Sequence, residues 1–80
     1  MAMENTEEFR LSEELKKLQN IAQDMDLNNK LRAQAIDRLG DMASHESLLV
    51  LLHLAGNDKL NIDERELALK RAGSIIKKGR

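Results

Sequence analysis

The sequence contains no cysteine, proline, tryptophan or tyrosine, and Phe9 is its only aromatic residue. Because cysteine is missing, disulfide bonds and thiolate chemistry are excluded, and a reducing compartment is compatible with the chain; we expect a cytoplasmic protein. The apolar residues are mostly leucine and alanine. Leucine and alanine are good helix formers, and strands favour the aromatic residues that are scarce here. The composition therefore predicts an all-α fold.

Long apolar runs and a dominant charge are also missing. The longest apolar run, residues 48–52, is far too short for a transmembrane segment, and no signal-peptide pattern opens the chain. The formal net charge at pH 7 is −1. Glutamates gather in residues 1–14 and basic residues in residues 70–80, as expected for acids at a helix start and bases at a helix end. Eighty residues predict one domain, 1–80, with residues 1–5 frayed.

An internal repeat is present at an offset of 33 residues, with copies at 12–44 and 45–77. Ten of the 33 aligned positions are identical, where chance would give roughly two or three. The identical pairs are Glu13/Glu46, Leu15/Leu48, Leu18/Leu51, Ala22/Ala55, Leu27/Leu60, Asn28/Asn61, Arg32/Arg65, Ala35/Ala68, Arg38/Arg71 and Gly40/Gly73. An internal period of this length is typical of stacked-repeat proteins.

Apolar spacing and capping residues predict four helices. The first begins near Asn5 or Thr6, or later with Ser12 as its N-cap, and ends near residue 23. The others span about 28–43, 46–55 and 61–78. Their end signals are Asn28 or Asn29, Ser44, Gly56, and Asn61 with Glu64 at capping-box spacing.

The apolar positions of these helices define the expected core. They are Leu11, Leu15, Leu18, Ala22 and Met25 on the first helix, Leu31, Ala35, Ile36, Leu39, Met42 and Ala43 on the second, and Ile62, Leu69, Ala72, Ile75 and Ile76 on the fourth. Arg32 is expected to face outward or edgewise. Gly40 and Gly73 lie inside helices that would prefer alanine, so we expect a close helix contact at both.

The second predicted helix carries the pattern Arg-x-x-Ala-x-x-x-Leu-Gly, and a turn and a leucine-rich helix follow it. The matching residues are Arg32, Ala35, Leu39 and Gly40, and again Arg65, Ala68 and Gly73, with Ala72 in place of leucine. This pattern resembles the short HEAT-like repeat, the compact variety found in phycobilisome lyases and many bacterial proteins. Asn29 and Ile62 stand where that family usually has a turn proline. Tetratricopeptide and ankyrin repeats fit worse, because their Trp/Tyr and Thr-Pro-Leu-His signatures are absent.

The resemblance covers roughly residues 12–77 and implies four helices in two HEAT-like hairpin repeats of 33 residues. A plain four-helix bundle is the alternative fold. Family members bind partners through the concave face of their B helices, which correspond here to residues 12–24 and 46–55. We therefore expect a non-catalytic module that binds a protein partner, or a second copy of itself, through the B-helix face.

Catalytic, cofactor and metal sites are not predicted, and no small-molecule substrate is expected. Asp24, Asp26 and Asn28 match the first ligand positions of a calcium-binding loop, but the glycine and the glutamate that such a loop needs at later positions are missing. His45 and His53 are eight residues apart with no cysteine between them, so a zinc site is not expected. The arginines are expected in surface or inter-repeat ion pairs; they are Arg32, Arg38, Arg65 and Arg71, with Asp24, Asp37 and Asp41 as partners.

A candidate partner-binding face follows from the differences between the copies. Leu49 and Leu52 stand where the first copy has Lys16 and Gln19. Either these leucines are buried against neighbouring helices, which we favour slightly for Leu52, or they form the centre of a contact surface. In the second case the surface consists of Leu49, Leu52 and His53 with a polar rim of Lys16, Gln19, Asn20 and Gln23.

A nucleic-acid-associated accessory protein is the alternative function. Its binding element would be the basic fourth helix, which could contact phosphates. The acidic overall balance and the absence of stacking aromatics disfavour this role.

Overall fold

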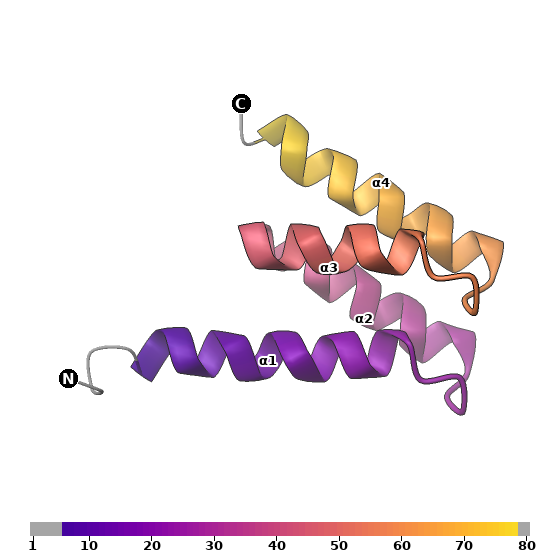
Figure 1. Cartoon of the computed structure of the whole chain (residues 1–80), viewed down its shortest axis with the longest axis horizontal. Coiled ribbons are helices and arrows are strands. Elements are labelled where there is room, and N and C mark those ends of the chain that lie inside the picture. The colour runs from indigo at the N-terminus through magenta and orange to yellow at the C-terminus, as the bar shows by residue number, and fades with distance from the viewer. Residues whose placement is uncertain (1–5, 79–80) are drawn as a thin grey trace.

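The computed structural model describes the backbone of residues 6–78 and the side chains of residues 12–78. Four helices make up the fold: α1 (Thr6–Ala22), α2 (Asn29–Met42), α3 (His45–Ala55) and α4 (Ile62–Lys78) (Figure 1). No strand occurs in residues 6–78, so the all-α prediction is confirmed. The expected fraying of residues 1–5, a cap at Asn5 and the side chain of Leu11 lie outside the described residues.

The helix starts are explained by side-chain caps. Asn28 accepts a hydrogen bond from the Leu31 amide at the start of α2. Ser44 caps α3, and its capping box is completed by Ser47. At the start of α4 the reciprocal bonds join Asn61 and Glu64, as the spacing predicted.

Three helix boundaries correct or refine the predictions. Ser12 lies inside α1, so the later start with Ser12 as cap is wrong. Helix α2 ends at Met42, one residue earlier than expected, and its C-cap Ala43 has a φ of 50°, in the left-handed region. Gly56 follows α3 as expected, but its φ is −93°, so it ends the helix without a left-handed turn. The boundaries keep the sequence offset: α1 and α3 end at Ala22 and Ala55, 33 residues apart.

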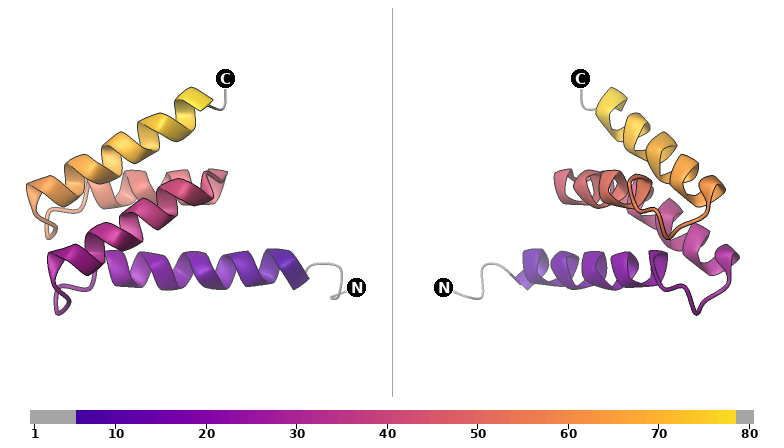
Figure 2. Two further views of the ribbon diagram at one scale, coloured as in Figure 1. Left: turned by 180° about the vertical axis from the view of Figure 1, so that it is seen from behind. Right: turned by 45° about the vertical axis from the view of Figure 1, so that its right-hand side comes forward.

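The helices form two layers. Helices α1 and α3 lie side by side in one layer, and α2 and α4 cross them in the other, as the view from behind shows (Figures 1 and 2). The shortest dimension is 17 Å, which fits two layers of helices packed about 8–10 Å apart. Among the described residues α1 and α4 make no contact. The arrangement is therefore open-ended, and the closed four-helix bundle is not observed.

The core lies between the two layers. Its fully buried large apolar side chains are Ile36, Leu39, Leu51 and Leu54, and smaller buried residues are Ala22, Ala35, Leu60, Ala68 and Ala72. Leu15, Leu18 and Leu48 are half-buried and pack against this cluster. Each fully buried leucine or isoleucine contributes about 1.5–3 kcal/mol, so the inner faces of α2 and α3 dominate the stability.

Several predicted core positions are instead exposed. Leu31, Met25 and Ala43 are exposed, and so are Ile62, Leu69 and Ile76 on α4. Arg32 shows the opposite difference: it was expected to face outward or edgewise, and it is buried. Residues 31 and 32 lie about 100° apart around the helix, and the second hairpin covers the side that carries Arg32. The spacing of the apolar residues did not predict which side of α2 the second hairpin covers.

The two repeated glycines have different surroundings. A Cβ added to the buried Gly40 would overlap the guanidinium of Arg71, so the close contact expected there is present, between a helix and a side chain. Nothing lies within 4 Å of a Cβ added to Gly73. The expectation of a close contact at Gly73 is therefore wrong, because no other helix of the described residues covers that side of α4.

We expect Gly73→Ala to stabilise the protein, since alanine is preferred over glycine inside a helix by up to about 1 kcal/mol. Gly40→Ala should lack this gain, because its methyl group displaces the Arg71 side chain. Chemical denaturation followed by circular dichroism measures both variants. Equal stabilisation of the two would show that Arg71 does not pack on Gly40.

Candidate functional site

The candidate partner-binding face is assembled from the layer formed by α1 and α3. On α1, Lys16 lies three residues before Gln19 and four before Asn20, and Gln23 follows directly after the last residue of the helix. On α3, Leu49 lies three residues before Leu52 and four before His53. Residues at these steps share one side of a helix. Because α1 and α3 lie in the same layer (Figure 1), the two stripes belong to neighbouring helices of one layer.

The exposure of these residues decides between the two interpretations of the leucines. Leu49 is 53% exposed and Leu52 41% exposed. The interpretation that neighbouring helices bury them is therefore wrong for the chain as it stands, including for Leu52. On the opposite side of α3, Leu51 and Leu54 are completely buried and carry the core contacts.

The polar residues complete the surface. Lys16, Asn20 and His53 are exposed, and Gln19 and Gln23 are half-buried. A surface hollow of about 560 Å³ adjoins the end of α3, and it is lined by Leu52, His53, Gly56, Asn57, Asp58 and Lys59. The face thus combines an apolar part on α3 with hydrogen-bonding groups on α1 and at the α3–α4 connection. Such a combination of apolar and hydrogen-bonding groups is suited to binding another protein surface.

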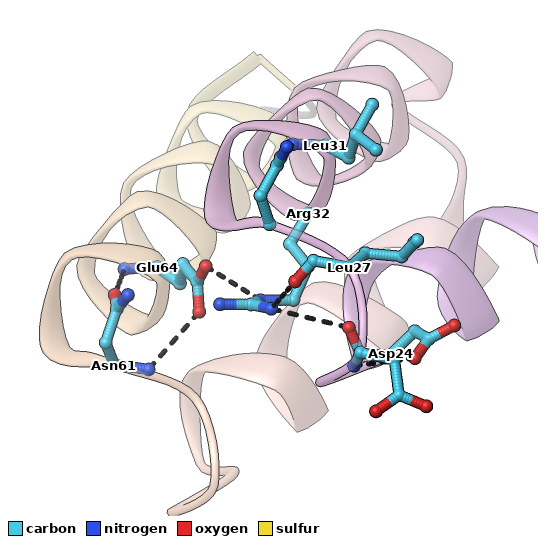
Figure 3. A network of polar contacts seen from close by, with 8 residues as sticks. Asp24, Leu27, Leu31, Arg32, Asn61 and Glu64 are labelled. Carbon is cyan, nitrogen blue, oxygen red and sulfur yellow. Dashed lines mark hydrogen bonds and ion pairs between the residues drawn. The ribbon is translucent and has the colours of Figure 1, made fainter.

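A buried ion pair fixes the second hairpin against the first. The Arg32 Nε donates a hydrogen bond of 2.8 Å to Oε2 of Glu64, and the two side chains are only 8% and 3% exposed. Figure 3 shows the guanidinium between Glu64 of α4 and the backbone of the α1–α2 connection. There its Nη1 donates to the carbonyl oxygens of Asp24 and Leu27.

Glu64 serves two purposes in this network. Its Oε1 accepts a hydrogen bond from the Asn61 amide, which caps α4, while its Oε2 receives Arg32 (Figure 3). Both carboxylate oxygens are therefore used, as a buried charge requires. The network joins the start of α4 to the start of α2, and thereby sets the position of α3 and its exposed leucines relative to α1.

A second ion pair joins the two hairpins nearer the ends of α2 and α4. Arg71 Nη2 donates to Oδ1 of Asp41 at 2.6 Å and to the carbonyl oxygen of Asp37 at 3.3 Å. The prediction of inter-repeat pairing is thus met by Arg71 with Asp41. Arg32 pairs instead with Glu64, which the sequence had identified only as a capping residue, and Arg38 is exposed.

Asp24 and Asn28, which match the first positions of a calcium-loop pattern, make hydrogen bonds within the α1–α2 connection and at the start of α2. Asp24 Oδ1 accepts a hydrogen bond from the Asp26 amide, and Asn28 caps α2. Among the residues that the structure describes, no group of three histidine, cysteine, aspartate or glutamate side chains could hold a metal ion. Within the same residues, no helix is both long and apolar enough to cross a membrane.

The sequence singled out Leu49 and Leu52 but left open whether they are buried or form a contact surface, with burial slightly favoured for Leu52. It also missed two features. The first is the buried pair of Arg32 and Glu64, for which the signal was an arginine repeated at the 33-residue offset. The second is a groove on the outer side of α4, lined by Ala55, Ile62, Arg65, Glu66 and Leu69. No family model matches the chain, and no curated protein or solved structure matches it at a significant level.

Proposed function

We propose that the protein is a non-catalytic, cytoplasmic interaction module of the HEAT-like kind, which binds a protein partner through the face formed by α1 and α3. The observation that supports this most is the pair of exposed leucines, Leu49 and Leu52, on a helix whose opposite side is completely buried. Exposed leucines need no special explanation when they are single. Here they share one side of α3 with His53, and Leu52 and His53 line a surface hollow, which favours a binding surface.

The scaffold behind the face suits this role. Leu51 and Leu54 anchor α3 in the core, and the Arg32–Glu64 pair holds the two hairpins together. A partner that covers Leu49 and Leu52 would therefore meet a helix already held in place, so little conformational entropy is lost on binding. Its own surface should be apolar at the centre and should offer hydrogen-bonding groups to Gln19 and Asn20 on α1 and to Gln23 just after it.

Nucleic-acid binding through α4 has less support. Within the basic segment Arg71 is already paired with Asp41. Lys77 and Lys78 occupy the last turn of α4, where cations interact favourably with the helix dipole. The exposed apolar residues of the same helix, Ile62, Leu69 and Ile76, also do not suit a phosphate-binding face.

Leu49→Lys tests the proposed face, because lysine is the residue of the first copy at this position. Since Leu49 is more than half exposed, the variant should retain its stability within about 0.5 kcal/mol. It should lose self-association or the capture of its partner. Thermal melting and sedimentation of the purified variant, together with a pull-down from the source cell, measure these properties.

Two variants serve as controls for this test. Leu51→Lys places an ammonium group in the core and should unfold the protein. Ile76→Lys alters an exposed apolar residue on another helix and should leave both stability and binding unchanged. If Leu49→Lys binds every partner and self-associates as the parent does, the α1–α3 face is not the binding surface.

A further inference from the structure

Positions related by the 33-residue offset have different burial, and the difference follows a pattern. Ile36 is completely buried whereas its counterpart Leu69 is 58% exposed. Gly40 lies under Arg71, whereas the space above Gly73 is open. Each of these residues faces the side of its hairpin on which a following hairpin would pack. The second hairpin covers this side of α2, and no described element covers it on α4 (Figure 1).

A groove marks this uncovered side. It encloses about 250 Å³ and is lined by Ala55, Ile62, Arg65, Glu66 and Leu69. The counterparts of three of these residues, Ala22, Arg32 and Ile36, are buried. The equivalent surface of the first copy, around Arg32, is covered by α4. The groove around Arg65 is the same surface of the second copy, left uncovered.

The way α4 packs around Arg32 indicates which kind of helix would fit the groove around Arg65. Helix α4 presents three buried residues at four-residue steps, Glu64, Ala68 and Ala72. The glutamate binds Arg32, and the alanines allow α4 to approach the core closely. A helix with one glutamate in its first turn and small residues four and eight positions later therefore matches the groove in charge and in shape.

We propose that the groove beside Arg65 binds such a helix from a partner protein, with Arg65 as the anchor for its carboxylate. The groove contains none of the side chains assigned to the centre and rim of the α1–α3 face, so the inference goes beyond the proposed function. Glu66 on the rim stands where the first copy has Ala33, which favours a single glutamate over an acidic run.

Arg65 can make the same contacts as Arg32. Its Nε now donates to the carbonyl oxygen of Ala55 at 2.9 Å, and its Nη1 lies 3.8 Å from Asp58, a side chain that is 94% exposed. Such an exposed pair contributes little, so the main cost of turning the guanidinium toward a carboxylate is the hydrogen bond to Ala55.

The backbone needed for the turned position is already formed. The Leu27 amide donates to the carbonyl of Asp24 at 3.1 Å, and the Leu60 amide donates to the carbonyl of Asn57 at 3.1 Å. The two connections thus repeat the same turn. When a carboxylate docks, Arg65 places its Nη1 on the carbonyls of Asn57 and Leu60 and its Nε on the carboxylate, as Arg32 does with Glu64.

A second copy of this chain does not match the groove. The helix that would stack there is α2 of that copy, and it has Leu31 at the position of Glu64 and Lys30 at the position of Asp63. Arg65 would then be covered by an apolar side chain and left without an acceptor, which is costly. The occupant we assign is therefore a helix of a different protein.

The test uses a synthetic peptide with the sequence of residues 60–78, held helical by a lactam between Glu66 and Lys70 and labelled with one tryptophan. These two residues are exposed on α4, and the protein itself has no tryptophan or tyrosine, so the label is the only indole in the sample. Fluorescence titration should give about tenfold tighter binding for this peptide than for its Glu64→Gln form, as expected for one charge-assisted hydrogen bond. Arg65→Gln in the protein should abolish the difference, and Arg38→Gln, which alters an exposed arginine on α2, should preserve it.

Amide shifts in a two-dimensional NMR spectrum locate the bound peptide. We expect shifts at Ala55, Ile62 and Leu69, with Gly40 unaffected. Equal affinities of the two peptides, no binding at millimolar concentration, or shifts at Gly40, which would mean that the peptide replaces the protein's own α4, would each overturn the proposal. None of these results bears on the α1–α3 face.

Discussion

Replacing Arg32 with methionine is expected to cost about 3–5 kcal/mol of unfolding free energy, because it leaves the buried Glu64 carboxylate without its partner. The side chains of both residues are almost completely buried. Methionine also leaves the carbonyl groups of Asp24 and Leu27 without the Nη1 donor. A domain of 80 residues has about 4–12 kcal/mol of stability in total, so the variant should lose a quarter or more of it. Urea denaturation followed by circular dichroism measures the loss.

Arg65→Met is the matched control for this experiment. Arg65 stands at the equivalent position, but it is only half-buried and its ionic partner Asp58 is exposed. The substitution removes one hydrogen bond to the Ala55 carbonyl, so we expect a loss of about 1 kcal/mol. Equal losses for the two arginines would mean that the start of α4 does not bury Arg32.

A second large effect is expected from Ile36→Ala. Ile36 has no exposed surface, and truncation of a fully buried isoleucine costs about 2–5 kcal/mol through lost burial and the cavity that remains. Leu69→Ala changes the counterpart residue, which is 58% exposed, and should cost less than about 1 kcal/mol. Thermal and urea unfolding of both variants measure the difference. Comparable losses would show that another element covers the outer side of α4.

Local sequence signals predicted the helices well. Asn28, Ser44 and the pair of Asn61 and Glu64 cap their helices in the structure as their spacing suggested. These caps act within three or four residues, so the sequence contains all of the interacting groups. The absence of proline and the leucine-rich composition were sufficient to predict the all-α class for the same local reason.

Which side of each helix is covered depends on contacts between distant residues. Leu31 and Arg32 exchange their expected places because α4, about thirty residues later, packs on the side of Arg32. Leu49, Leu52 and Leu69 are leucines that a helix pattern assigns to a core, yet the two-layer arrangement leaves them exposed. An apolar residue at helical spacing shows that its side is suited to burial, and only the arrangement of the helices shows whether this chain buries it.

Equivalent residues of the two copies, compared in the structure, show which sides of the helices are covered. Pairs with the same residue type but different burial, such as Arg32 with Arg65, mark the surfaces on which hairpins pack. Pairs with different residue types, such as Lys16 with Leu49, mark the surface proposed for the partner. The first comparison locates the groove on α4, and the second locates the face on α1 and α3.

The packing of α4 on α2 through Arg32 and Glu64 is the central claim, because it places both proposed surfaces. A double-mutant cycle measures it most directly, with Arg32→Met, Glu64→Leu and the double variant compared by urea denaturation. Both variants that carry Glu64→Leu lose the hydrogen bond between Glu64 and the Asn61 amide, so this loss cancels in the cycle. The account predicts a coupling energy of about 2–3 kcal/mol, with the double variant more stable than Arg32→Met alone. A coupling energy below about 0.5 kcal/mol would contradict it, since the two side chains would then not interact in the folded protein.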